Sequence, residues 1–354
     1  MFFMESLKKY FLASNSCEGF ISYFDTAYDP NDGWKAYIIK GGPGTGKSTF
    51  MKRIAKECFN RGYKPHICPC SSDPDSLDLV VVPETKIVIM DGTAPHTIDP
   101  KYAGAVENIL NFGEFWDVEK LSRRQSEIIA VTNNNKVLHK TASIYLLTAG
   151  NLLKDNFLRE QRAINETKIK DYTLKLCKKH IKGKGAKREE KVRFLSAVSP
   201  QGVVSYPETI FKYTDTPLII KDFYGAVSIE ILKDVRLFAL NKGFRVLSFK
   251  NPFLPQYLEH IVIPELNFAV VTENNFIHFN TDARRVHFER FLHKEKLNIK
   301  RLKYNKKAAN ELLDSAVDTL KLAKKVHDDL EEFYIDSIDY KKLDDFADKF
   351  IEKI

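Results

Sequence analysis

The 354-residue sequence contains no uncharged apolar run that approaches the ~20 residues needed to cross a bilayer, so we expect no contact with a membrane. Cysteine is also scarce, with five residues in total. Cys68 and Cys70 flank a single proline, which is not the paired spacing of zinc ligands, and no group of histidines complements them. Free thiols are typical of a reducing compartment, and we therefore expect a cytoplasmic protein.

A dense field of one charge sign is missing as well. The formal net charge of +8 is compatible with nucleic-acid binding, but Lys and Arg alternate with Asp and Glu along most of the chain. The one dense basic run, at residues 182–188, contains two glycines. We interpret it as part of a solvated linker, residues 182–192, and do not expect nucleic acid to be a partner.

What the sequence does contain is a long internal repeat. The segment 38–91 aligns without a gap with the segment 219–272, and Ile38-Ile-Lys40 recurs as Ile219-Ile-Lys221. Further along, Asn60-Arg-Gly-Tyr63 matches Asn241-Lys-Gly-Phe244. We interpret the chain as a tandem duplication with one domain at 1–181 and a second at 193–354.

Each repeat has the same order of predicted elements. We expect strands at 36–40, 64–68, 79–82 and 86–90 with a helix at 49–59, and strands at 217–221, 245–249, 260–263 and 268–271 in the second repeat. Continuous apolar strands alternating with helices predict an α/β fold with two three-layer α/β/α domains built on parallel sheets. Apolar residues at helical spacing within 118–181 and 284–354 predict a helical hairpin after each domain.

The first predicted strand ends in a phosphate-binding pattern. Residues 41–48 read Gly-Gly-Pro-Gly-Thr-Gly-Lys-Ser and satisfy G-x-x-x-x-G-K-S/T between a strand and a helix. Glycines let the backbone curl so that its N–H groups and the helix N-terminus face an anion. The residues expected to hold the phosphates are Gly42, Pro43, Gly44, Thr45, Gly46, Lys47, Ser48 and Thr49. Lys47 is expected to contact the β- and γ-phosphates and Ser48 to bind Mg²⁺.

A second metal ligand is expected at the end of a nearby strand. Ile87-Val-Ile-Met-Asp91 has four apolar residues followed by an acid, which is typical of a Walker B strand. We therefore predict that Asp91 binds Mg²⁺ or one of its waters. Gly92 follows it, so the glutamate that activates water in many ATPases is missing at this position.

Other polar residues lie in loops where a substrate would approach. Asp73 and Asp75 follow the second strand and have no acidic counterpart in the second repeat, so either is a candidate base, while turn formation around Pro74 is the alternative. His96 and Asp99 lie in the loop after Asp91. His96 is a candidate for sensing the γ-phosphate or acting as a base, with stabilisation of a turn as the alternative, and Asp99 is a candidate for orienting water. The pairs Arg123-Arg124 and Arg284-Arg285 are possible arginine fingers, although an interface or solvated role is the favoured interpretation.

The second repeat lacks this chemistry. Val227-Ser228-Ile229 stands opposite Gly46-Lys47-Ser48, and Thr272 stands opposite Asp91. The cation is absent and Val227 prevents close approach of the backbone. We therefore predict a degenerate domain that binds no nucleotide.

With these residues the chain resembles the P-loop NTPase superfamily, and more closely bacterial proteins with two tandem P-loop domains described as ATP-binding proteins or ATPases. The resemblance implies Mg²⁺-dependent ATP binding at Lys47, Ser48 and Asp91. The loop is also similar to that of AAA-type ATPases. The leading hypothesis is a slow ATPase whose nucleotide state controls contact with its own second domain or with a protein partner. The alternatives are a small-molecule or nucleotide kinase with Asp73 or Asp75 as base, and a nucleotide-gated scaffold that does not hydrolyse ATP.

Overall fold

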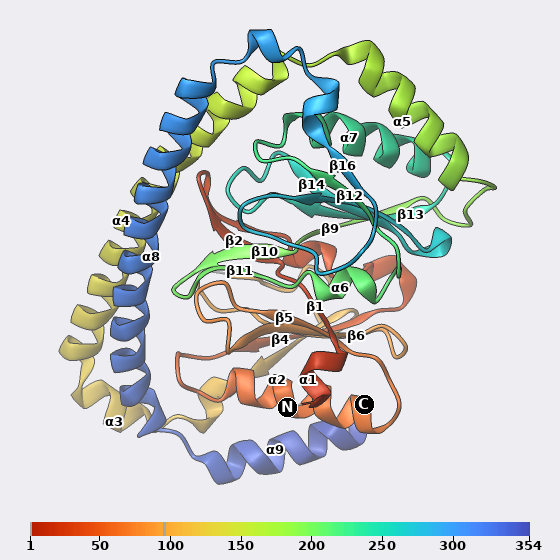
Figure 1. Cartoon of the computed structure of the whole chain (residues 1–354). Helices are drawn as coiled ribbons and strands as arrows, with labels where there is room; N and C mark the ends of the chain where they lie inside the picture. The colour runs from red at the N-terminus through yellow and green to blue at the C-terminus, as the bar shows by residue number, and fades with distance from the viewer. Residues whose placement is uncertain (1, 95–96) are drawn as a thin grey trace.

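The computed structural model describes residues 2–94 and 97–354 of a mixed α/β chain. Within these residues the strands form two six-stranded sheets and a four-stranded sheet between them, and most neighbouring strands of the large sheets are parallel (Figure 1). Residues 2–117 contain the first large sheet and residues 189–298 the second, and we call these segments the first half and the second half.

Both large sheets have the same topology. The first sheet contains, in order of adjacency, β1 (Lys8–Lys9), β5 (His66–Pro69), β6 (Leu77–Val82), β7 (Ile87–Asp91), β4 (Lys35–Lys40) and β8 (Glu107–Asn111). The second contains, in the corresponding order, β9 (Glu189–Phe194), β13 (Arg245–Lys250), β14 (Leu258–Ile263), β15 (Phe268–Glu273), β12 (Leu218–Lys221) and β16 (Arg285–His287). The repeat in the sequence is therefore matched by a repeat in strand order.

One strand in each sheet corrects the expectation of wholly parallel sheets. β6 is antiparallel to both β5 and β7, and β14 is antiparallel to both β13 and β15. The cause is the short connection after each strand, since a tight turn joins only antiparallel neighbours whereas a parallel pair needs a long crossover. In the first half this turn contains Lys86 with φ 54°, and in the second half Asn267 with φ 49°.

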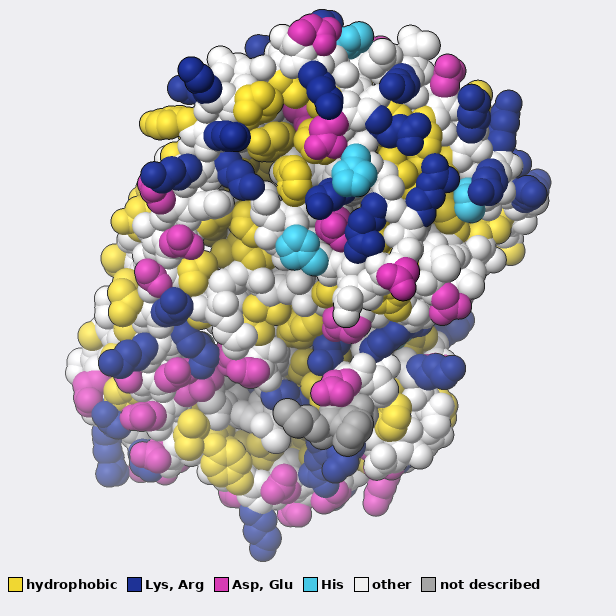
Figure 2. All heavy atoms as spheres, in the orientation of Figure 1, with side chains coloured by type: hydrophobic (Ala, Val, Ile, Leu, Met, Phe, Trp, Pro, Cys, Tyr) yellow, Lys and Arg dark blue, Asp and Glu magenta, His cyan; other side chains and the backbone are white. Residues whose placement is uncertain are grey.

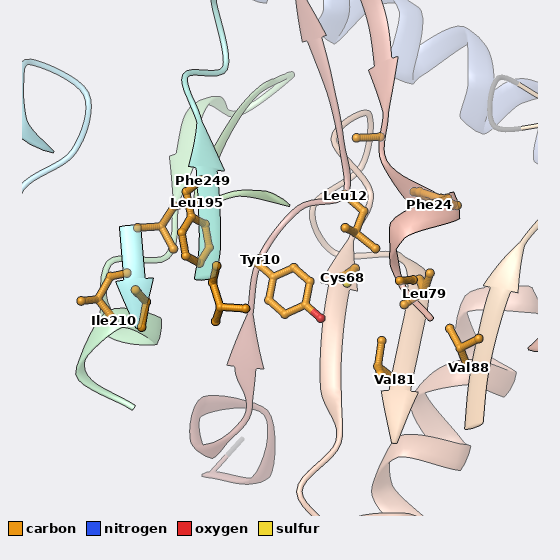
Figure 3. Close-up of a cluster of buried hydrophobic side chains, with 14 of the residues drawn as sticks. Tyr10, Leu12, Phe24, Cys68, Leu79, Val81, Val88, Leu195, Ile210 and Phe249 are labelled. Carbon is orange, nitrogen blue, oxygen red and sulfur yellow. The ribbon is translucent and has the colours of Figure 1, made fainter. Parts of the chain in front are cut away.

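Two hairpins join the halves. β2 (Ala13–Ser16) and β3 (Gly19–Ser22) belong to the first half, and β10 (Ser196–Ser199) and β11 (Gly202–Ser205) to the second. β2 pairs with β10 at Asn15 and Val198, and Phe11 pairs with Phe194 in an isolated bridge. The buried cluster in Figure 3 accordingly mixes both halves, with Tyr10 lying between side chains such as Leu79 and Phe249. The halves therefore share this cluster.

The basic linker predicted at 182–192 is partly structured. Residues 189–192 belong to β9, an edge strand that pairs in parallel with β13. The sequence did not reveal this strand because β9 begins with Glu189, Glu190 and Lys191 and is therefore not an apolar run.

The helical regions form two exchanged arms instead of the predicted hairpins. The central arm is α4 (Gln125–Gln161) with α5 (Glu166–His180), and the C-terminal arm is α8 (Ile299–Ile335) with α9 (Tyr340–Lys353). α4 and α8 pack side by side along their length (Figure 1), with Asn135 bonded to Ala323 and Asn156 to Leu302, so they run antiparallel.

Each arm ends on the other half. α5 packs on α7 (Ala226–Asn241) of the second half, and α9 packs on α2 (Lys47–Asn60) of the first half. In α9 the buried residues Leu343, Ala347 and Phe350 recur at helical spacing, and Phe350 contacts the ring of Phe50 in α2. The short helices are α1 (Phe2–Ser6), α3 (Val118–Arg123) and α6 (Glu208–Phe211).

The surface carries both charge signs. Lys and Arg side chains are interspersed with Asp and Glu over the face shown in Figure 2. In the described ranges, none of the helices is both long enough and apolar enough to span a membrane.

Candidate functional site

In the loop between β4 and α2, two glycines adopt the left-handed backbone conformation. Gly44 and Gly46 have φ of 65° and 81°, a region that glycine adopts without strain, and Gly46 is the N-cap of α2. Because α2 begins at Lys47, the free N–H groups of its first turn lie at the end of this loop, where an anion is stabilised. Thr45 is buried and its hydroxyl donates to the carbonyl of Gly42 at 2.8 Å, which closes the curve of the loop.

Lys47 lies inside the site. Its ammonium donates to the carbonyl of Gly42 and lies 3.6 Å from Oδ2 of Asp91. The side chains of Lys47 and Asp91 are 11% and 15% exposed, so the pair is largely shielded from solvent. The Lys47 ammonium is therefore already positioned at the loop, between the carbonyls of Gly41 and Gly42 and the carboxylate of Asp91.

Asp91 and Ser48 are oriented by neighbouring groups. β7 lies directly beside β4, with Asp91 in register with Ile39, and Oδ1 of Asp91 accepts hydrogen bonds from the amide and the hydroxyl of Thr93. The hydroxyl of Ser48 accepts a bond from the amide of Leu77 at 2.9 Å. Ser48 therefore keeps one lone pair for a cation, and Oδ2 of Asp91 stays clear of the Thr93 bonds.

The Ser48 hydroxyl and the Asp91 carboxylate are suitable ligands for an Mg²⁺ ion that is also bound by phosphate oxygens. Mg²⁺ prefers oxygen ligands and is usually held by one or two protein groups, with phosphates and water completing the shell. Ser48 and Asp91 supply one hydroxyl and one carboxylate. Clusters of three or more His, Cys, Asp or Glu side chains with metal-binding geometry do not occur in the described part of the chain.

The remaining predicted acids are engaged elsewhere. Asp73 accepts from the hydroxyl of Ser76 at 2.8 Å and lies 3.7 Å from the ammonium of Lys324. Asp75 accepts from the side-chain amide of Gln201 at 3.3 Å. Asp99 is 78% exposed and pairs with Lys40 at 2.9 Å.

His96, predicted to contact the γ-phosphate, lies outside the described residues. Within the phosphate-binding segment, Pro43 is partly buried and Thr49 is exposed.

The ion pairs described for Arg123, Arg124 and Arg285 are made with residues outside the phosphate-binding loop. Arg123 is exposed and pairs with Glu119, while Arg124 pairs with Glu127 and stacks on Phe333 at 3.9 Å. In the second half Arg285 pairs with Glu273. These contacts agree with the solvated or interface role.

The C-terminal arm covers the loop, which the sequence did not reveal. The amide of Gly44 donates to Oε1 of Glu331 at 3.3 Å. A Cβ on Gly42 would lie 2.6 Å from the ring of Tyr334, and one on Gly46 would lie 2.9 Å from Leu343. A hydrogen bond from His327 and the nearby charges of His327 and Lys324 lower the pKa of Glu331, so this carboxylate is ionised at neutral pH.

The second half has a corresponding loop, and its own carboxylate fills it. Asp222 stands where the first half has Gly41 and accepts bonds from the amides of Tyr224, Gly225 and Ser228 at 2.9–3.2 Å. Glu160, near the end of α4, accepts from the amide of Ala226 at 3.0 Å. The donors that would face a phosphate are therefore already used. The replacement of Gly41 by Asp222 in the aligned repeat was a signal for this.

Little space remains beside this second loop. The cavity there has a volume of about 50 Å³ and is lined by residues that include Phe157, Ser228 and Thr272. Ligand pockets for drug-sized molecules usually measure about 300–1,000 Å³. The cavity beside the second loop is therefore several times smaller than such a pocket.

Glu160 and Asp222 are both buried, at 0% and 1% exposure. Burial, followed by the charge of Asp222, raises the pKa of Glu160 well above its usual range. Burial also raises the pKa of Asp222, although its three backbone hydrogen bonds oppose the shift. The pair is therefore stabilised in a form that retains a proton.

Comparison with known proteins gives no match to a family model, a curated protein or a solved structure. The functional assignment consequently depends on the residues and contacts of this chain.

Proposed function

We propose that the chain binds Mg·ATP at Gly41–Thr49 and hydrolyses it slowly, with nucleotide occupancy controlling how the C-terminal arm rests on the first half. The observation that supports this best is the position of Lys47. It lies at the start of α2, behind a loop with two left-handed glycines, and 3.6 Å from Asp91 on the adjacent strand.

Each group has a defined role in the proposal. The loop amides and Lys47 bind phosphate oxygens, and Ser48 and Asp91 hold Mg²⁺. Bound Mg²⁺ would neutralise phosphate charge. Slow turnover is expected because Gly92, and not a glutamate, follows Asp91.

Hydrolysis is preferred to transfer onto a small acceptor. Asp73, the candidate base of a kinase, is held by Ser76 and faces the ammonium of Lys324. To act as a base towards an acceptor, Asp73 would have to give up these two contacts.

The test measures ATP binding and phosphate release by the purified chain with Mg²⁺. Lys47→Ala is compared with Lys56→Ala, which removes an exposed lysine from the same helix. We expect slow phosphate release without an acceptor by the parent and by Lys56→Ala, and none by Lys47→Ala. Equal binding and turnover by Lys47→Ala and the parent would refute the site. Release that requires an added acceptor would support a kinase, and tight binding without turnover a scaffold.

A further inference from the structure

One face of α8 lies over the phosphate-binding loop. Lys324, His327 and Glu331 follow one another at three- and four-residue spacing, so they share a face of the helix. The backbone of Glu331 is so close to the loop that a Cβ on Gly44 would lie 2.8 Å from its carbonyl oxygen. The contact is therefore made by the helix itself as well as by a long side chain.

Glu331 occupies a donor that a phosphate would use. Its Oε1 accepts from the amide of Gly44 at 3.3 Å, and the same oxygen lies 3.4 Å from Nε2 of His327. A carboxylate and a phosphate oxygen compete for the same N–H group, because both are anionic acceptors. In the second half the corresponding loop amides are likewise occupied by carboxylates, those of Asp222 and Glu160.

Lys324 is linked to Ser48 through a series of contacts. Its ammonium is 3.7 Å from Oδ2 of Asp73. Asp73 in turn accepts from Ser76, and the next residue, Leu77, donates its amide to the hydroxyl of Ser48. The face from Lys324 to Glu331 is thus linked to Ser48 by way of Asp73 at one end and contacts Gly44 through Glu331 at the other.

The charge on Lys324 is maintained by its neighbours. Burial lowers the pKa of Lys324, but the hydrogen bond to Asp328 and the charge of Asp73 outweigh this effect and leave the pKa raised. Lys324 is therefore a cation at neutral pH. Its side chain is 27% exposed and held by Asp328 and Asp73, which limits the entropy it loses on binding an anion.

On these contacts, and given the nucleotide site proposed above, we propose that Lys324 of the C-terminal arm binds the terminal phosphate of the nucleotide, and that Glu331 occupies this space until the nucleotide displaces it. The site is then completed by a residue 277 positions after Lys47, delivered by the helix that also contacts the central arm. A triphosphate engages Lys324, whereas a diphosphate does not reach it. The arm consequently distinguishes ATP from ADP.

The test compares the affinities for Mg·ATP and Mg·ADP by titration calorimetry. Lys324→Met is the test variant, Lys324→Arg the conservative variant, and Lys321→Met the matched control on the same helix, where Lys321 is 58% exposed and pairs with Asp318. We expect Lys324→Met to weaken ATP binding about tenfold and ADP binding less than twofold, since one charge-assisted hydrogen bond corresponds to roughly this factor. Lys324→Arg should retain most of the ATP preference, and Lys321→Met all of it.

Glu331→Gln provides a second, independent variant. It removes the competing charge but retains an acceptor for Gly44, so we expect ATP to bind about threefold more tightly. A parent that binds no nucleotide would overturn the proposed function itself. A parent that binds ATP while the ratio of ATP to ADP affinity is the same in Lys324→Met would overturn the role of Lys324 and leave the site intact. Unchanged or weaker ATP binding by Glu331→Gln would overturn the displacement by phosphate.

Discussion

The carboxylate of Glu331 accepts a hydrogen bond from the backbone amide of Gly44 at 3.3 Å, although the two residues are 287 positions apart in the chain. Gly44 belongs to the loop of the first half, and Glu331 to the arm that follows the second half. Any ligand that takes the amide of Gly44 therefore has to move Glu331, and this links the state of the loop to the position of the arm.

The first prediction concerns this contact. Gly44→Ala places a side chain in a left-handed conformation and against the backbone of Glu331, at 2.8 Å. We expect a loss of more than 2 kcal/mol in the free energy of unfolding, of which roughly 1 kcal/mol comes from the backbone conformation. Chemical denaturation measures it.

Gly62→Ala is the control for that loss. Gly62 has a similar φ of 89°, but nothing lies within 4 Å of an added Cβ. The free energy of unfolding of Gly62→Ala should fall only by the cost of the left-handed backbone conformation, about 1 kcal/mol. Equal losses in the two variants would contradict the close approach of the arm to the loop.

The second prediction concerns Asp91. Asp91→Asn keeps the size of the side chain but removes its charge, so Mg²⁺ should no longer strengthen ATP binding, and the Mg²⁺-dependent gain should fall about tenfold or more. Asp99→Asn is the control, because Asp99 is exposed and pairs with Lys40. ATP titrations with Mg²⁺ or with EDTA compare the two. An undiminished effect of Mg²⁺ in Asp91→Asn would contradict its role as a ligand.

The third prediction is a dependence of stability on pH. The pKa of Glu160 is raised in the folded chain, so the folded state holds a proton that the unfolded state releases above about pH 4.5. The contribution of Glu160 to the free energy of unfolding is fully present below that pH, and it is lost as the pH rises through the pKa that Glu160 has in the folded state. Glu160→Gln cannot ionise and still accepts from Ala226. At pH 8 the free energy of unfolding of this variant should exceed that of the parent by on the order of 1–3 kcal/mol, and its stability should depend less on pH.

The control for this variant is Glu166→Gln. Glu166 is 78% exposed at the start of α5, on the same arm. We expect it to leave the pH profile of the melting temperature unchanged. A Glu160→Gln variant that is less stable than the parent at pH 8 would show that the carboxylate is stabilised there as an anion.

The fourth prediction tests the docking of α9. Phe350 is 7% exposed and packs edge-on against Tyr37 and tilted against Phe50. Phe350→Ala should cost about 3–4 kcal/mol of stability because it leaves a cavity between α9 and the first half. Leu322→Ala, at a position 57% exposed on α8, should cost less than about 1 kcal/mol. Equal melting temperatures for both variants would contradict the exchange of the arms.

Local features could be predicted from the sequence because their causes are local. The strand before Gly41, the helix after Gly46 and the strand that ends at Asp91 follow from apolar runs and glycine positions, and the structure contains them as β4, α2 and β7. The pairing of Lys47 with Asp91 follows from these elements, since β7 is the neighbour of β4.

The partners of the long helices could not be predicted. A periodic pattern shows which face of α4 or α8 is apolar, but an apolar face packs equally well on its own half or on the other one. The direction of β6 was hidden for a similar reason, because a strand buried on both faces reads alike in parallel and antiparallel sheets. The residues of α8 that contact the loop, Glu331 and Tyr334, are charged or polar positions on a helix and carry no signal of their own.

The proposed function gives the chain one nucleotide site, at Gly41–Thr49. Equilibrium dialysis with radiolabelled ATP and Mg²⁺ measures how many nucleotides each chain binds. We expect one bound nucleotide per chain for the parent and for Lys56→Ala, and none for Lys47→Ala at the same concentrations. Two nucleotides per chain, or one that persists in Lys47→Ala, would contradict it.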